Sequence, residues 1–305
     1  MRGGAIVASQ PVTQARVRSR LRGVGILSLA VLVGGWSAVA ASAPASVQLR
    51  VLRLVDHSRR AQFRNGTSGP RTLVTYVRFP TRGHAPFPLI VFAHGFALTP
   101  QIYARLLNTW TRAGYVVAAP VFPVENANAP GGPDRSDLGN EPGDIRFVIS
   151  RLIGSTSPVR GLVDSKKIAV AGQSDGAVAA LSAAYDKRFV DRRIDAAMIL
   201  SGAALAGFTP PPPGLPPLLA MQGTSDPINP PSATTYYFQL MRQPKFLIWL
   251  LGATHLPPYT TTDRWAAVVD RATTAFLDHY LRGAPLHRLI EAGTQAGVAR
   301  MTSNP

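Results

Sequence analysis

The sequence predicts an α/β protein with a mostly parallel sheet, helices on both faces of that sheet, and antiparallel strands added at its N-terminal side. Two observations predict this class. From Pro88 onward, short apolar runs alternate along the chain with segments of helical spacing. The chain also has 305 residues and a hydrophobic content of 46%, which is ample for one large buried core.

The first 45 residues differ from the rest and have the layout of a secretory signal peptide. Four arginines between residues 16 and 22 precede an uncharged apolar stretch from Val24 to Ala40. Small-residue cleavage signals occur at 38–40 and 43–45, and the second would make Ser46 the mature N-terminus. We therefore expect a secreted, extracellular protein. The alternative is an uncleaved membrane anchor, because about 17 apolar residues can just span a bilayer.

The elements that follow can be assigned in order. Alternating segments at Val47–Val55 and Thr72–Arg78 flank Asn65-Gly66 and predict an antiparallel hairpin. The continuous apolar run 88–93 predicts a strand buried on both faces. The later elements are a helix over 102–113, a strand over 115–121, a helix over 144–153 capped by Asp144, a strand over 168–171, a helix after Ser174, strands over 196–200 and 218–222, a helix over 233–241, a strand over 246–251 and a helix over 262–281.

These elements predict one domain over residues 46–283, followed by a short, loosely attached C-terminal tail at 284–305. The segment between Ser201 and Leu218 is short and contains the proline-rich run 210–217. Proline disfavours helix, so no large cap domain is expected there. Either the segment leaves a neighbouring site open, or it is a plain surface loop.

The stretch Gly172-Gln173-Ser174-Asp175-Gly176 reads G-x-S-x-G and lies between a predicted strand and a run of small residues suited to a closely packed helix. In this context the serine occupies a sharp strand-to-helix turn, with its hydroxyl ready to attack a carbonyl. Ser174 is therefore the predicted nucleophile. Asp175 is interpreted as a charge at the helix N-terminus, where the helix dipole stabilises it.

A serine nucleophile needs a base, and the base needs an acid to orient it. Asp226 and His255 follow Ser174 in that order, each just after a hydrophobic strand. The remaining histidines either precede Ser174 or fall in or after the last helix. Asp226 is accordingly the predicted acid and His255 the predicted base, although an aspartate before proline also favours a plain turn.

The backbone N–H groups of Phe96 and Asp175 are the predicted donors to an oxyanion. His94 is interpreted as structural, with its ring tying the loop to nearby backbone. The loop from Val124 to Glu141, which contains Arg135, is expected to border the pocket. No cofactor is expected, and no metal either, because the sequence has no cysteine and no His-x-x-x-His or Asp-rich cluster.

The formal net charge is +16, of which the first 45 residues supply five arginines and no acid, so +11 remains for the rest. The arginines there are scattered and do not alternate with aromatic residues, which argues against a nucleic-acid partner. We expect an arginine-rich solvated surface with at most weak attraction to anionic membrane or cell-wall polymers. Nothing in the sequence fixes the oligomeric state.

The absence of cysteine excludes disulfides and a cysteine nucleophile.

Together the 172–176 elbow, the His94-Gly95-Phe96 loop and the turns ending at Asp226 and His255 resemble the α/β hydrolase superfamily. Within it, the chain is most similar to the branch of chlorophyllase-like, platelet-activating-factor acetylhydrolase-like and cutinase-like polyester hydrolases. The resemblance covers about Val47 to Gly283. It implies the α/β hydrolase fold and an esterase with a Ser174, His255 and Asp226 triad.

The residues and the resemblance together predict a secreted serine hydrolase that cleaves a small-molecule or lipid-like carboxylic ester through an acyl-enzyme. Two alternatives remain open. The first is an exported acyltransferase with the same triad that passes the acyl group to an acceptor hydroxyl. The second is a non-catalytic α/β hydrolase scaffold that serves as a binding module.

Overall fold

The computed structural model describes residues 46–209 and 211–304, so the predicted signal peptide at 1–45 lies outside the described residues. The strands are β1 (Val47–Gln62), β2 (Ser68–Pro80), β3 (Phe87–Ala93), β4 (Val116–Val121), β5 (Val163–Gln173), β6 (Ala196–Leu200), β7 (Leu218–Gly223), β8 (Lys245–Leu250) and β9 (Ala299–Asn304). The α-helices are α1 (Ala104–Arg112), α2 (Glu141–Ile153), α3 (Asp175–Tyr185), α4 (Pro231–Leu240), α5 (Pro257–Thr260), α6 (Ala266–Arg282) and α7 (His287–Ala292).

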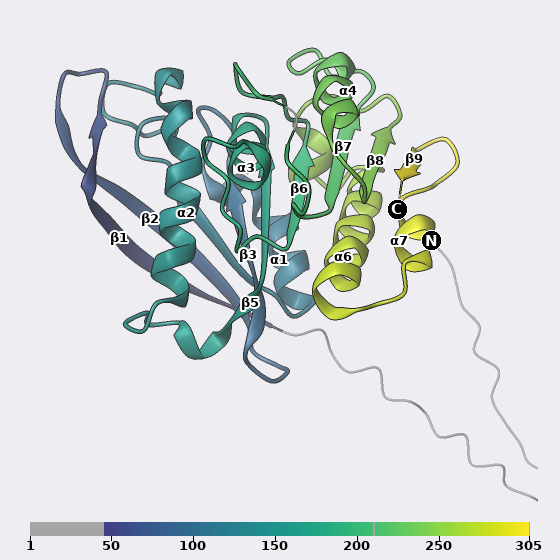
Figure 1. Ribbon diagram of the computed structural model, residues 1–305, viewed down its shortest axis with the longest axis horizontal. Coiled ribbons are helices and arrows are strands. Elements are labelled where there is room, and N and C mark those ends of the chain that lie inside the picture. The colour runs from purple at the N-terminus through teal and green to yellow at the C-terminus, as the bar shows by residue number, and fades with distance from the viewer. Residues whose placement is uncertain (1–45, 210, 305) are drawn as a thin grey trace, which may run out of the picture. The chain divides into compact units, whose positions relative to one another are not determined.

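All nine strands form one sheet in the order β1-β2-β4-β3-β5-β6-β7-β8-β9 (Figure 1). The strands from β4 to β8 in this order pair in parallel, whereas β1 with β2, β2 with β4, and β8 with β9 pair antiparallel. The predicted fold class is therefore confirmed. The predicted N-terminal hairpin is also confirmed: its turn contains Gly66, whose positive φ of 81° suits a residue without a Cβ.

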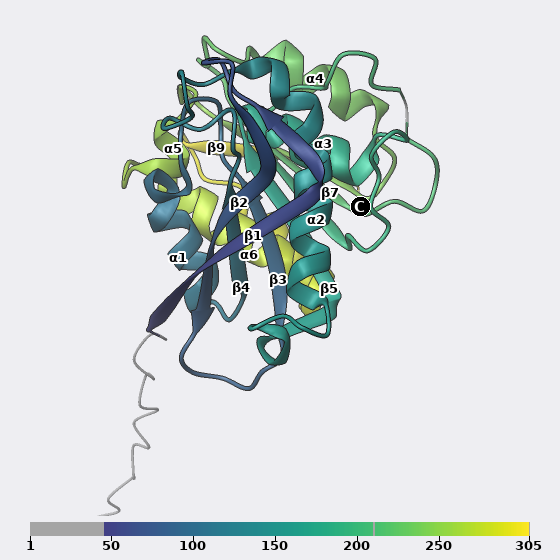
Figure 2. The same cartoon turned by 90° about the vertical axis from the view of Figure 1, so that its left-hand side faces the viewer.

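Helices cover the sheet on both sides, as Figure 2 shows. On one side α2, α3 and α4 pack with side chains of the central strands in one apolar cluster. On the other side α1, α5, α6 and α7 contribute to a second cluster. Every residue of α3 is buried, and six of its eleven residues are alanine or glycine, which lets this helix lie close to β5. The close packing brings the first turn of α3 to the edge where the parallel strands end.

The C-terminal residues differ from the expected loose tail. Residues 287–292 form α7, and β9 pairs with β8 from Ala299 opposite Leu250 to Asn304 opposite Lys245. The prediction of a loosely attached segment was therefore wrong. The six residues of β9 lack an apolar alternation because the strand lies at the edge of the sheet and is held mainly by backbone hydrogen bonds.

The described residues between β6 and β7 form neither helix nor strand, in line with the predicted absence of a large cap. The start of α2 differs from prediction, because this helix begins at Glu141, three residues before Asp144. Asp144 consequently lies inside the first turn and does not cap the helix. Its carboxylate instead accepts hydrogen bonds from Arg71 of β2.

Arg71 is a fully buried cation that joins β2 to α2 and to the neighbouring 3-10 helix η2 (Arg135–Asn140). Its Nε and Nη2 lie 2.7 Å from the two carboxylate oxygens of Asp144, and its Nη1 donates to Asp137 Oδ1 at 2.9 Å. One guanidinium thus binds two buried carboxylates, and Arg59 supplies a second cation to Asp144 at 2.8 Å. Burial alone would lower the pKa of Arg71, but these carboxylates raise it above the usual arginine value.

The variant Arg71→Ala should lower the free energy of unfolding by about 3–5 kcal/mol, because it leaves buried Asp137 without its cation and Asp144 with Arg59 as its remaining cation. Urea denaturation followed by circular dichroism measures this. Arg60→Ala is the matched control, since Arg60 is an exposed arginine that bonds to Ser68, and it should change stability by no more than about 0.5 kcal/mol. Equal unfolding midpoints for the two variants would contradict this role of Arg71.

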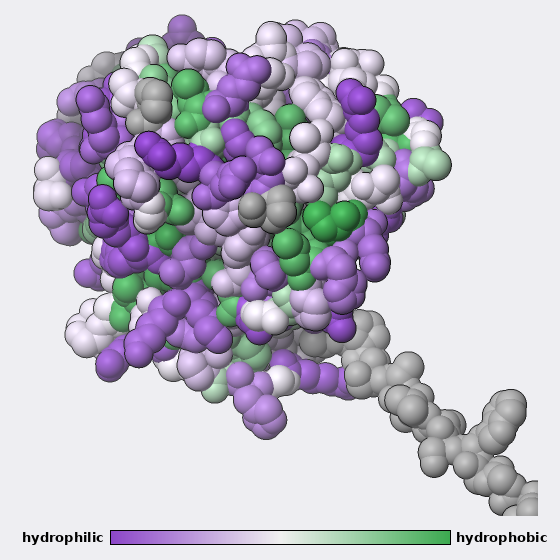
Figure 3. Space-filling view, turned by 45° about the vertical axis from the view of Figure 1, so that its right-hand side comes forward, coloured by the Kyte–Doolittle hydropathy of each residue, from purple (hydrophilic) through white to green (hydrophobic). Residues whose placement is uncertain are grey.

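On the face drawn in Figure 3 the surface is mostly hydrophilic, and its hydrophobic areas are small and separated. Across 46–209 and 211–304, none of the helices combines the length and the apolar character needed to cross a membrane. A few large apolar side chains are nevertheless exposed. Two of them, Phe96 and Ile228, line a cavity together with Ser174.

Candidate active site

Ser174 lies between the end of β5 and the start of α3, in a sharply strained turn. Its φ of 57° and ψ of −124° fall in a region that residues with a Cβ rarely adopt. A Cβ on Gly172 would clash with the carbonyl of Gly176, and one on Gly176 would clash with the carbonyl of Ala93. The two glycines therefore allow the close approach of strand and helix that this turn requires, as the sequence pattern predicted.

The structure brings the three predicted triad residues together. The Nε2 atom of His255 lies 2.8 Å from Ser174 Oγ, and its Nδ1 atom lies 2.7 Å from Asp226 Oδ2. Asp226 follows β7 and His255 follows β8, so the two side chains meet Ser174 at the edge formed by the ends of parallel strands. The arrangement allows His255 to accept the serine proton while Asp226 holds its ring.

Asp226 is held in place by several donors. Its Oδ1 accepts hydrogen bonds from the backbone N–H groups of Ile228 at 2.9 Å and Asn229 at 3.0 Å. Its Oδ2 also accepts a bond of 3.2 Å from the Gln222 side chain, and that amide is fixed by Thr234. The residue is buried, and these bonds fix the position of its carboxylate.

The two predicted oxyanion donors border the same cavity. Phe96 follows β3, and Asp175 is the first residue of α3, whose N–H has no partner within the helix. Among the described residues, neither N–H donates to a backbone carbonyl. The loop that carries Phe96 is anchored by the next residue, because Ala97 donates its N–H to the carbonyl of Glu125 at 2.8 Å.

His94 has the structural role predicted for it. Its Nδ1 lies 2.9 Å from the carbonyl oxygen of Gly95, and its Nε2 accepts the N–H of Phe122 at 3.0 Å. These two bonds require a neutral ring with the proton on Nδ1. Burial lowers the pKa of His94 to about 4, so this neutral form persists well below neutral pH.

Because the pKa of His94 is lower in the folded protein than in the unfolded chain, where it is about 6.5, the unfolded state binds more protons between pH 6.5 and pH 4. The contribution of His94 to stability is complete above about pH 6.5 and falls by about 3 kcal/mol as the pH drops to about 4. Urea denaturation of the protein and of His94→Asn across this range measures it. The difference between the two curves isolates His94, and parallel curves would contradict the prediction.

Gln173 and Tyr103 contribute contacts that the sequence analysis did not foresee. The Gln173 amide nitrogen donates to the His255 carbonyl at 3.1 Å and lies 3.3 Å from His255 Nε2. Its amide oxygen accepts the Tyr103 hydroxyl at 2.7 Å. The position of Gln173 in the pentapeptide was a signal that it lies near the site, whereas nothing in the sequence pointed to Tyr103.

Arg135 also reaches the site, from the loop that was expected to border the pocket. Its Nε and Nη2 atoms each lie 2.6 Å from one oxygen of the Asp175 carboxylate. Arg135 and Asp175 line a cavity of about 310 Å³ together with Phe96, Ser174, Ile228 and Asn229. The Asp175 side chain is therefore one partner of an ion pair beside Ser174, a contact that the sequence did not reveal.

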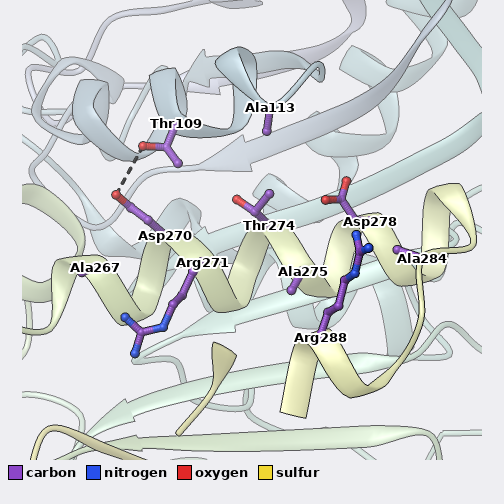
Figure 4. Close-up of a pocket in the computed structure, with 10 residues that line it drawn as sticks. All are labelled: Thr109, Ala113, Ala267, Asp270, Arg271, Thr274, Ala275, Asp278, Ala284 and Arg288. Carbon is purple, nitrogen blue, oxygen red and sulfur yellow. Dashed lines mark hydrogen bonds between the residues drawn. The ribbon is translucent and has the colours of Figure 1, made fainter. Parts of the chain in front are cut away.

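A larger cavity of about 560 Å³ lies between α1 and α6, and none of the predicted site residues lines it (Figure 4). Its acidic groups already have partners: Asp270 pairs with Arg105 and accepts from Thr109, and Asp278 accepts from Tyr115. Within the part of the chain that the structure describes, no cluster of histidines and acids has the arrangement of a metal site.

Comparisons with known proteins bear on the family and the fold of the chain. A family model described as chlorophyllase matches residues 51–229. No curated protein sequence matches the chain. A solved structure, the ferulic acid esterase from Streptomyces cinnamoneus, superposes with a TM-score of 0.63 at 24% sequence identity, covering 80% of this chain and 93% of that one. At this identity the structural likeness shows the fold alone.

Proposed function

The chain belongs to the chlorophyllase family, and from this premise we propose that Ser174, His255 and Asp226 hydrolyse carboxylic esters through a covalent acyl-enzyme. Family membership makes the protein a carboxylic ester hydrolase of the α/β hydrolase superfamily that acts on a small-molecule ester, as the sequence predicted. The observation that carries the proposal is the unbroken chain of two hydrogen bonds, 2.8 Å and 2.7 Å long, from the serine hydroxyl to the aspartate.

In the first half of the reaction, Ser174 Oγ attacks the carbonyl carbon while its proton passes to His255 Nε2. The electron pair of the carbonyl π bond moves to oxygen, and the N–H groups of Phe96 and Asp175 donate to this oxyanion. When the carbonyl re-forms, the ester C–O bond breaks. The leaving alkoxide takes the proton from His255, which leaves the acyl group on Ser174.

In the second half, a water molecule replaces the alcohol. The oxygen of this water attacks the acyl carbon while His255 Nε2 takes one of the water protons. His255 then gives this proton to Ser174 Oγ as the C–O bond to serine breaks. The free acid leaves. Throughout the cycle, Asp226 accepts the hydrogen bond from His255 Nδ1 and stabilises the positive ring.

We also propose that residues 1–45 direct export and that the mature protein begins at Ser46. Support comes from the arginines before the apolar stretch and from the cleavage signal at 43–45. The net charge of +11 after this segment favours weak association with anionic membrane or cell-wall surfaces outside the cell. N-terminal sequencing of the exported protein tests the cleavage, and retention of residues 24–40 in a membrane fraction would contradict it.

A panel of p-nitrophenyl esters from acetate to palmitate, assayed with and without an acceptor alcohol, tests the ester hydrolase proposal. We expect turnover that yields one free acid for each p-nitrophenolate released. The product must remain the acid when the acceptor is present, because transfer to the alcohol would indicate an acyltransferase. The absence of turnover on every ester would contradict hydrolysis by this triad.

A further inference from the structure

The side chain of Asp175 places a negative charge beside the proposed oxyanion site. Its backbone N–H is one of the two proposed donors, and its side chain is 4% exposed. A fixed carboxylate in such a poorly solvated position opposes the charge that develops on the substrate oxygen in the transition state. Hydrolysis at Ser174 therefore requires something that neutralises this carboxylate.

Arg135 provides the neutralising charge. Its Nε donates to Asp175 Oδ2 and its Nη2 to Asp175 Oδ1, both at 2.6 Å, so the pair has bidentate geometry. Of the six residues that line the cavity, Arg135 alone is cationic. Ion pairs at the surface generally contribute little, and the Arg135 side chain is 62% exposed. Its partner, however, is buried, so loss of the arginine leaves a buried charge unpaired.

Two further acids lie behind this pair and do not compete for Arg135. Glu125 and Glu141 are fully buried, and no donor in the described ranges serves any of their four carboxyl oxygens other than the two groups themselves. Burial raises the pKa of Glu125 to about 8 and that of Glu141 well above its usual value, and the hydrogen bonds of Arg135 go to Asp175 and not to either glutamate.

The other charged groups around the two glutamates have their own partners. Asp175, Asp137 and Arg135 face Glu125, and Asp137 and Asp144 face Glu141. Asp137 and Asp144 are bound by Arg71, and Asp144 also pairs with Arg59. Among these acids, Asp175 is thus the one that Arg135 binds directly.

We propose that Arg135 is a positioning residue for ester hydrolysis: it neutralises the Asp175 carboxylate and holds the first turn of α3, so that the Asp175 N–H stabilises the oxyanion without an opposing charge. This inference rests on the proposed function. Arg135 acts through Asp175 and touches no reacting atom. Its effect must therefore appear in kcat more than in KM, and it must depend on the charge of residue 175.

A double-mutant cycle tests this. Arg135→Ala should lower kcat by about tenfold or more, because the unpaired carboxylate remains beside the oxyanion. In a protein that already carries Asp175→Asn, the same arginine substitution should change kcat by less than about threefold, because no charge remains to be balanced.

Arg188→Ala is the matched control, because it breaks a comparable ion pair to buried Asp186 just beyond the other end of α3. This control should keep kcat within about twofold of the unchanged protein. The inference is overturned if Arg135→Ala acts only on KM, if its effect is equal with aspartate or asparagine at position 175, or if Arg188→Ala lowers kcat as much.

Labelling of Ser174 by a fluorophosphonate separates the inference from the proposed function. When the unchanged protein is labelled at Ser174 and the cycle shows no coupling, the inference alone fails. When the unchanged protein is not labelled there, the proposed function fails and the inference fails with it. Labelling together with coupling between positions 135 and 175 supports both.

Discussion

Replacing Ser174 with alanine is expected to lower kcat for a p-nitrophenyl ester by about 10⁵-fold or more, because no other group can form the acyl-enzyme. Only oxyanion stabilisation and substrate binding would remain to accelerate attack by water. The fold should persist, since within the described residues the hydroxyl hydrogen-bonds to His255 alone. The turn itself is held by backbone bonds such as that from the Ser174 N–H to the Leu200 carbonyl, 3.1 Å long.

Ser182→Ala is the control for this variant. Ser182 is also fully buried in α3, and its hydroxyl has no hydrogen-bond partner in the described part of the chain. Its loss should leave kcat within about twofold of the unchanged protein. Hydrolysis by Ser174→Ala at a rate close to that of the control would show that another residue is the nucleophile.

The variant Asp226→Asn is expected to lower kcat by about 10⁴-fold. An amide at this position is uncharged and favours the wrong tautomer of His255, so the ring neither accepts the serine proton well nor has its positive form stabilised. KM should change much less than kcat, because Asp226 is 4% exposed and lies behind the imidazole. Steady-state kinetics at several pH values measures both constants.

Asp263→Asn is the control for this substitution. Asp263 also accepts backbone N–H bonds, from Trp265 and Ala266, but it lies at the start of α6 away from the triad. Its variant should retain full kcat even if stability falls slightly. Equal kcat values for the two asparagine variants would show that Asp226 serves only as a turn residue. The position of Asp226 before a proline left this alternative open.

Much of the fold could be predicted because each of its elements is encoded locally. The continuous apolar run of β3 predicts a strand that is buried on both faces, and the small residues of α3 predict a closely packed helix. Neither prediction requires knowledge of the neighbouring elements. The triad was predictable for a related reason. Parallel strands bring their ends to one edge of the sheet, so polar residues that follow β5, β7 and β8 must lie close together.

The rest of the site depends on contacts without a local signal. Arg135 and Asp175 are 40 residues apart, and neither segment has a periodic pattern that would indicate their pairing. Full burial of Glu125 and Glu141 runs against the usual exposure of glutamate, so their sequence context favours a surface loop. The edge strand β9 was missed because its pairing with β8 uses backbone groups, which every segment carries.

Mapping the covalent adduct of a fluorophosphonate probe by peptide mass spectrometry tests the central claim most directly. The proposed triad predicts one adduct per chain, located on Ser174, and no adduct in Ser174→Ala. An adduct on a different residue, or labelling that persists in the alanine variant, would contradict the claim that Ser174 is the serine activated by His255 and Asp226.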